Sequence, residues 1–111
     1  MDKQYSSFKD FWPYYLSEHL NTTSRRLHYL GTSMVIIATV LCLLNAKFLW
    51  LCVVPLLGYG PAWVGHFFFE KNKPATFDYP LYSLFADFKM FYLMLTGQIA
   101  NEIDQIKRAK L

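Results

Sequence analysis

Apolar side chains gather in two long runs in the middle of the chain. Residues 27–46 carry no formal charge over about twenty positions, which at 1.5 Å per residue is long enough to cross roughly 30 Å of hydrocarbon. A second run covers residues 48–69, and its prolines and glycines are tolerated in a spanning helix where neighbouring segments satisfy the backbone. Only a short turn around Lys47 separates the two runs, so the pattern predicts an antiparallel hairpin of two spanning helices.

An aromatic stripe precedes the hairpin. Between Phe8 and His19, apolar residues recur at helical spacing, and Ser7 followed by Asp10 matches an N-cap serine with an acid at the third helical position. This pattern predicts an amphipathic helix that lies in the membrane interface.

A further helix is predicted after the hairpin, with Asp78 as its N-cap and Pro80 in its first turn. Asp87 interrupts the apolar side chains of this helix, so either the helix lies at the interface or Asp87 turns inward to a partner. We expect the interface. The predicted fold class is therefore all-α, an integral membrane helical hairpin with two spanning helices and two flanking amphipathic or interfacial helices. Residues 1–111 are expected to form a single membrane-embedded domain.

The composition supports lipid as the second solvent. Of the 111 residues, 54% are hydrophobic and 19% aromatic, which is more apolar surface than a soluble core of this size can hide. The net charge of +3 is modest, and no basic stretch interleaved with aromatics lies outside the apolar runs, so nucleic acid is a poor partner and membrane lipid a good one. Apart from Lys47, every basic residue can lie on one side of the membrane, which predicts that both termini are cytoplasmic.

Three histidines are expected at one level of the membrane. Counted from the turn at Lys47, His28 and His66 lie at nearly equal depth, and His19 stands just before the polar break that precedes the first spanning helix. Glu70 follows His66 at a spacing that places both side chains on one helix face, with their Cβ atoms about 5 to 6 Å apart. An isolated pair of this kind is more often a plain hydrogen bond, but three imidazoles beside carboxylates have the composition of a divalent transition-metal site.

The ligand types favour iron, with zinc and manganese as alternatives, because imidazole and carboxylate without thiolate suit these metals. Cys42 and Cys52 lie inside the apolar runs, and no serine-nucleophile motif occurs, so the sequence does not support covalent catalysis. Glu18 is either a general base or a group that orients a ligand imidazole. Zinc-dependent hydrolysis is the competing chemistry to an iron-dependent oxidation.

Three segments, SEH, SRRLHYLGT and AWVGHFFFEKNKPATF, resemble the small membrane family that includes the fungal 2-hydroxy fatty acid dioxygenases, in its short bacterial form. They carry His19, His28, His66 and Glu70, to which the resemblance assigns the family's Fe(II) site. It implies an Fe(II)-dependent oxidation of a 2-hydroxy fatty acid to the fatty acid one carbon shorter, with a fatty-acyl substrate and dioxygen as partners. It also implies a location in the bacterial inner membrane.

Other residues receive roles from this hypothesis. Glu18 and Arg25 are the catalytic candidates, with Arg25 holding the substrate carboxylate, although basic residues at a membrane edge usually bind headgroups. Asp87 and Arg26 are candidates for orienting the ligands, and Trp63 with residues 67–69 for lining an acyl groove. A metal-dependent lipid hydrolase and a non-enzymatic lipid-binding scaffold with a structural metal remain the alternatives, and the oligomeric state is left open.

Overall fold

Residues 5–109 are described by the computed structural model, and all regular structure in that range is helical. The elements are, in chain order, α1 (Phe8–Ser17), α2 (Thr22–Leu44), the 3₁₀-helix η1 (Phe48–Cys52), α3 (Val54–Val64), the π-helix η2 (Gly65–Glu70), the 3₁₀-helix η3 (Ala75–Phe77), α4 (Pro80–Leu95) and α5 (Ile99–Ala109). The all-α fold class is confirmed.

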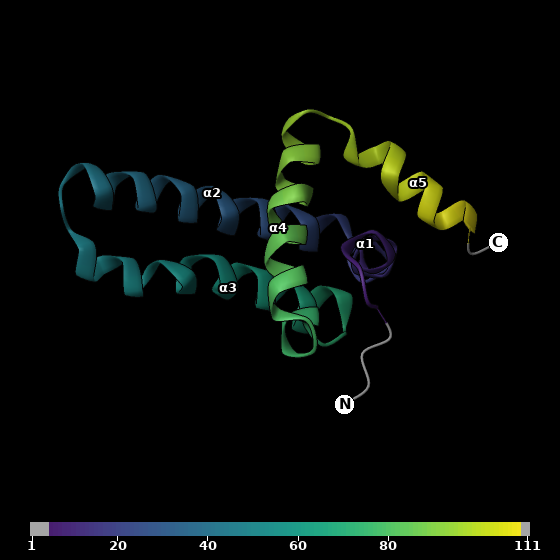
Figure 1. Cartoon of the computed structure of the whole chain (residues 1–111). Helices are drawn as coiled ribbons and strands as arrows, with labels where there is room; N and C mark the ends of the chain where they lie inside the picture. Colours follow the sequence, from purple (N-terminus) through teal and green to yellow (C-terminus); the bar gives the residue numbers. More distant parts are fainter. Residues whose placement is uncertain (1–4, 110–111) are drawn as a thin grey trace.

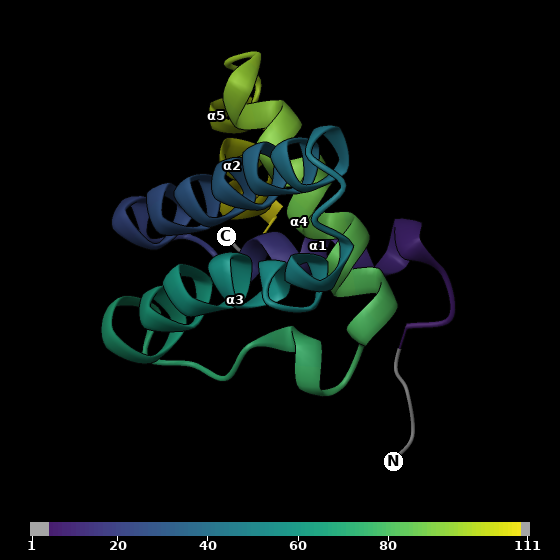
Figure 2. The ribbon, with the colours of Figure 1, turned by 90° about the vertical axis from the view of Figure 1, so that its left-hand side faces the viewer.

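The predicted hairpin forms the long arm of the molecule, where α2 and α3 lie side by side in opposite directions (Figures 1 and 2). In the described part of the chain, two helical stretches are long and apolar enough to cross a membrane, Thr22–Leu44 and the continuous stretch Phe48–Glu70, each of 23 residues. Large apolar side chains cover the outside of this arm, as at Leu44 and Leu49, which are 77% and 87% exposed. An exposed apolar surface of this extent is typical of contact with lipid.

The two long helices approach each other closely at Gly31. A Cβ atom built on Gly31 would lie 2.8 Å from the carbonyl oxygen of Gly58 and 3.2 Å from its Cα atom. Packing of backbone against backbone through small residues is a common way for membrane helices to associate. It holds α2 and α3 at the separation on which the site described below depends.

The buried core lies at the open end of the hairpin and not between α2 and α3. There α4 crosses the hairpin, with α1 and α5 packed near it (Figure 1). The buried apolar residues of this core are Phe11, Trp12, Tyr15, Leu16, Ala75, Tyr79, Ala86, Met90, Leu93 and Ile103. Most of them are the aromatic stripe of α1 and the residues of α4 and α5 that face it, so the stripe predicted to lie on the membrane packs largely against protein.

The helix-capping predictions have mixed outcomes. Ser7 caps α1 as expected, since its Oγ accepts a hydrogen bond from the backbone N–H of Asp10 at 3.2 Å. Pro80 occupies the first turn of α4, also as expected. The prediction for Asp78 is wrong, because the N-cap position belongs to Tyr79, and a carboxylate oxygen of Asp78 lies 3.6 Å from Nζ of Lys73.

The C-terminal region contains two helices where the sequence predicted one. α4 ends with Thr96 as its C-cap, and Gly97 then adopts a positive φ of 77°. This left-handed conformation ends a helix and is available to glycine without steric cost. Within residues 5–109, three α-helices therefore flank the hairpin, and the chain turns at Gly97 so that α5 packs against α1.

Candidate metal centre

His19, His28 and His66 meet at the base of the hairpin. His19 follows the end of α1, His28 lies in α2, and His66 lies in the π-helix η2. Their side chains are 0%, 4% and 3% exposed, and one nitrogen from each ring lies within 4.8 Å of the other two. The predicted convergence of the three histidines is confirmed, and these side chains could hold a metal ion.

The protonation pattern of His19 and His28 follows from their hydrogen bonds. Nδ1 of His19 lies 2.6 Å from the carbonyl oxygen of Tyr15, and Nδ1 of His28 lies 2.9 Å from that of Ser24. A carbonyl oxygen can only accept, so each Nδ1 must carry the proton. In a neutral imidazole the other nitrogen, Nε2, then has a free lone pair.

His66 is oriented in the same way by a side chain from the loop after η2. Its Nδ1 lies 2.6 Å from Oδ1 of Asn72, while Nδ2 of Asn72 donates to the backbone carbonyl of Glu18 at 3.0 Å. The bond to Glu18 settles which end of the amide faces the histidine, because only the NH₂ group can donate to a carbonyl. His66 therefore also carries its proton on Nδ1 and has its lone pair on Nε2.

The Nε2 atoms of His19 and His28 are 3.1 Å apart. With both protons held at Nδ1, no hydrogen lies between these two atoms, and two lone pairs face each other across a hydrogen-bonding distance. Burial, together with the charges of His28 and His66, keeps the pKa of His19 well below its usual value, so a protonated ring does not resolve the conflict. Two nitrogens bound at about 2.1 Å to one ion at a right angle would be about 3 Å apart, so a metal fits this geometry.

Glu70 does not join the three histidines. Its Oε1 accepts a hydrogen bond of 2.9 Å from the backbone N–H of Asn21, the N-cap residue of α2. The carboxylate thus ties the end of the second long helix to the start of the first. The geometry gives Glu70 this structural contact and does not support its predicted role as a ligand.

A glycine allows the helices to approach at this level as well. A Cβ atom on Gly65 would lie 2.7 Å from Oγ and 3.1 Å from Cα of Ser24. Ser24 provides the carbonyl that orients His28, and Gly65 directly precedes His66. The contact therefore brings the two ligand-bearing turns together.

Arg25 also positions a histidine, through the backbone. Its Nη1 donates to the carbonyl oxygen of His19 at 2.8 Å, and its Nη2 donates to Oγ1 of Thr22 at 3.3 Å. Arg26 is exposed, and no contact places it beside the histidines. The backbone carbonyl of Glu18 accepts a hydrogen bond from Asn72. The role of the Glu18 carboxylate as a general base stays a prediction, as does the contact of Arg25 with the substrate.

Asp87 turns inward from α4, contrary to the expectation that this helix only lies at the interface. Its Oδ1 accepts a hydrogen bond from the hydroxyl of Tyr15, whose ring stacks on His19 with 4.1 Å between centroids. Burial raises the pKa of Asp87 to about 7, and the hydrogen bond from Tyr15 opposes the rise only in part. The carboxyl group thus lies beside the histidines without belonging to their cluster.

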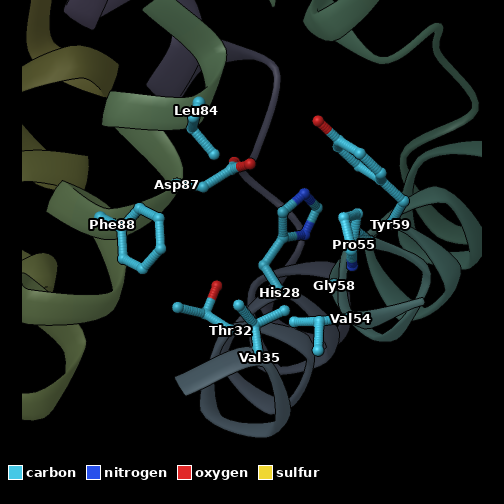
Figure 3. Close-up of a pocket in the computed structure, with 11 residues that line it drawn as sticks. His28, Thr32, Val35, Val54, Pro55, Gly58, Tyr59, Leu84, Asp87 and Phe88 are labelled. Carbon is cyan, nitrogen blue, oxygen red and sulfur yellow. The ribbon is translucent and has the colours of Figure 1, made fainter. Parts of the chain in front are cut away.

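An apolar cavity of about 240 Å³ adjoins the cluster between α2, α3 and α4 (Figure 3). In Figure 3 the carboxyl group of Asp87 lies at the wall of this cavity and points toward the ring of His28. The other lining residues are Thr32, Val35, Val54, Pro55, Gly58, Tyr59, Ala62, Leu84 and Phe88. Residues 67–69, which were predicted to line an acyl groove, do not line this cavity and are 50%, 67% and 44% exposed. Trp63, predicted with them, lines a smaller adjoining cavity.

Asn72 and Tyr15 were missed by the sequence reasoning. Asn72 stands in a Lys-Asn-Lys-Pro stretch that is typical of a turn, and Tyr15 belongs to an aromatic stripe that packing alone explains. Neither pattern carries a signal for contact with a distant histidine. Only the packing of the loop and of α1 against the hairpin reveals these contacts.

Replacement of Asn72 by leucine is expected to weaken metal binding by about 10- to 100-fold, because His66 would lose the acceptor that holds its tautomer and orientation. Competition with a chelator of known affinity measures the change. The matched control is Asn45→Leu, since Asn45 is exposed at the far end of the hairpin and bonds only its own helix. Equal metal affinity of the Asn72→Leu variant and the wild type would show that this contact does not orient a ligand.

Comparison of the sequence with known proteins adds one finding. No curated protein and no solved structure matches the chain. The family model described as "2-hydroxy-palmitic acid dioxygenase Mpo1-like" matches residues 5–99, a range that contains all three histidines, Asn72 and Asp87. The chain belongs to the Mpo1-like family.

Proposed function

We propose that this protein is a membrane-embedded, Fe(II)-dependent dioxygenase that converts a 2-hydroxy fatty acid to the fatty acid one carbon shorter. The observation that carries the proposal is the cluster of three buried imidazoles, in which one ring nitrogen from each lies within 4.8 Å of the other two and every Nδ1 has an acceptor. The family description supports a 2-hydroxy acid of the length of palmitic acid as the substrate.

The ligand set suits an anionic, chelating substrate. Three neutral imidazoles leave the full charge of a divalent ion uncompensated, and a 2-hydroxy carboxylate offers one negative charge and two oxygen atoms to it. His19, His28 and His66 would hold the ion. When bound, Fe(II) supplies a Lewis acid and a reductant for dioxygen.

The apolar cavity explains how the chain would hold the rest of the substrate. It starts beside His28 and Asp87 and extends between the hydrophobic faces of α2, α3 and α4, as an acyl chain requires (Figure 3). Its apolar lining favours an alkyl chain over water, and it directs that chain into the membrane-length part of the hairpin. Asp87 lines this cavity on the side of α4, and its carboxyl group accepts a hydrogen bond from the hydroxyl of Tyr15.

The test is oxygen uptake by the Fe(II)-loaded protein with 2-hydroxypalmitate. The expected products are pentadecanoate, carbon dioxide and water, with equal amounts of dioxygen consumed and carbon dioxide released. Palmitate, which lacks the 2-hydroxyl group, is the control substrate and should give no uptake. Release of fatty acid from an ester without oxygen would indicate the hydrolase instead, and a metal-loaded protein with neither activity would indicate a scaffold.

We further infer that the protein lies in the bacterial inner membrane with both termini in the cytoplasm. The turn at Lys47 would then face outward and the loop around Lys73 inward, in line with the cationic residues at the base of the hairpin. With Cys42 and Cys52 replaced by alanine, an impermeant thiol reagent added outside intact cells should label Lys47→Cys and not Lys73→Cys. Labelling of Lys73→Cys alone would reverse the orientation.

A further inference from the structure

A second, smaller cavity touches the histidine cluster. Its volume is about 10 Å³, room for about one atom of the size of a water oxygen. All three histidines line it, together with Trp63 of α3 and Ser83 of α4. Four of its lining residues, His28, Tyr59, Ala62 and Asp87, also line the large apolar cavity, so the two spaces adjoin.

Two hydrogen-bond donors at this small cavity have no acceptor. Four buried side-chain atoms among residues 5–109 have no hydrogen-bond partner. Nε1 of Trp63 and Oγ of Ser83 belong to residues that line this cavity, whereas Oγ of Ser24 and Oδ1 of Asp78 do not. Ser83 is 2% exposed, and its hydroxyl does not bond to the preceding turn of its own helix, as a buried helical serine commonly does. A buried donor without an acceptor destabilises the folded protein, so such groups are rare outside sites that receive a ligand.

Packing restricts the position of the Trp63 ring. The ring lies 5.2 Å from that of Phe77 and 5.5 Å from that of Tyr59, measured between centroids. These two contacts restrict the indole while its N–H group remains unpaired. The donor is therefore already in place before any ligand binds, which lowers the entropic cost of forming a hydrogen bond.

The chemistry of the cavity defines what it accepts. The three Nε2 atoms provide lone pairs for a cation, whereas Trp63 and Ser83 provide N–H and O–H donors for an anion. The group that satisfies both sets is an oxygen ligand of a bound metal. Since the apolar cavity begins at the same residues, a molecule with an oxygen-rich head and an alkyl tail fits the two spaces together.

We propose that Trp63 and Ser83 are substrate-binding residues whose Nε1–H and Oγ–H groups donate to the oxygen atoms of the 2-hydroxy carboxylate head group. This assignment rests on the proposed function for the nature of the head group. The small cavity then holds an oxygen atom of the head group beside the histidines, and the large cavity holds the tail. The two donors select for a chelating anion without contributing to metal binding.

Two conservative variants test the assignment, Trp63→Phe, which keeps an aromatic ring, and Ser83→Ala. Calorimetry with Fe(II)-loaded protein and 2-hydroxypalmitate under anaerobic conditions should show binding weakened by roughly 10- to 100-fold in each, because each loses a hydrogen bond to a charged group. Metal content should equal that of the wild type. Thermal unfolding of the metal-free, ligand-free protein should show equal or higher stability, since each change removes an unsatisfied donor.

Matched controls lie elsewhere in the chain. Trp50→Phe changes an exposed tryptophan near the hairpin turn, and Ser17→Ala removes a hydroxyl that donates to the carbonyl of Tyr14 at 2.6 Å. Neither should alter the affinity for 2-hydroxypalmitate. Ser17→Ala should lower thermal stability slightly, which is the opposite of the effect expected for Ser83→Ala.

The outcomes separate this assignment from the proposed function. Wild-type affinity in both site variants would overturn it, as would loss of metal or of ligand-free stability, which would indicate purely structural residues. If wild-type protein consumes no oxygen but both variants still bind 2-hydroxypalmitate more weakly, the dioxygenase proposal fails and the binding site stands. If wild-type protein does not bind 2-hydroxypalmitate at all, the assignment fails whatever the oxygen measurement shows.

Discussion

Replacement of His28 by alanine is expected to remove the bound metal and, with it, all oxygen uptake. Only three nitrogen ligands converge within residues 5–109, so loss of one leaves two imidazoles and a cavity in a buried, weakly polar space. A ligand set reduced in this way does not compensate a divalent ion for its lost hydration. The measurement is the metal content per chain after purification in detergent, followed by oxygen uptake with 2-hydroxypalmitate.

His19→Ala and His66→Ala should have the same effect, because each histidine has the same arrangement of Nδ1 donor and Nε2 lone pair. Glu70→Gln is the contrasting control. Glutamine keeps an acceptor for the N–H of Asn21, so the variant should retain its metal although the family resemblance assigned Glu70 to the metal site. Wild-type iron content in folded His28→Ala protein would refute the metal centre, and loss of iron in Glu70→Gln would restore the carboxylate to it.

The second large effect is expected from Gly31→Val, a change that removes no polar group. A side chain at this position meets the backbone of Gly58, which cannot move aside as a flexible side chain can, so α2 and α3 must separate. Overpacking of this kind costs about 1–3 kcal/mol or more, and here it also displaces His28 relative to His66. Thermal unfolding in detergent should show the loss of stability, and metal analysis should show a strongly reduced content.

Gly60→Val is the matched control for this experiment. Gly60 lies in the same hairpin, but no atom comes within 4 Å of a Cβ built on it, and its surface is exposed. The valine should therefore leave metal content unchanged and alter stability little. Equal behaviour of the two variants would mean that the close approach at Gly31 does not determine the geometry of the centre.

Depth along the hairpin could be predicted from the sequence because a helix rises by a constant amount per residue. Lys47 marks the turn, and counting from it places His28 and His66 at one level without any knowledge of packing. The N-cap at Ser7 could be predicted for a similar reason, since it depends on residues a few positions apart. The meeting of the three histidines, and the all-α hairpin that carries them, were therefore predictable.

Depth alone does not determine which way a side chain faces or what it touches. Glu70 and Asp87 illustrate this. The resemblance assigned Glu70 to the metal site, yet Glu70 bonds the start of α2, and Asp87 turns inward to Tyr15 although its helix was expected at the interface. Both outcomes depend on how α1 and α4 cross the hairpin, and a crossing angle is a property of two packed surfaces that no single periodicity encodes.

Asn72 and Ser83 were not predicted at the site, because nothing in their local sequence distinguishes them from turn or core residues. Trp63 was predicted only to line an acyl groove, and its sequence does not reveal that its N–H group is unpaired. Asn72 reaches His66 only because the loop after η2 folds back on the end of α1, where Glu18 accepts its N–H. The amino-acid sequence by itself determined the membrane-length hairpin and the level of the histidines. Tertiary packing decided the tautomer of each histidine, the inward position of the Asp87 carboxyl group and the lack of acceptors for Trp63 and Ser83. Each of these depends on atoms from elements far apart in the chain.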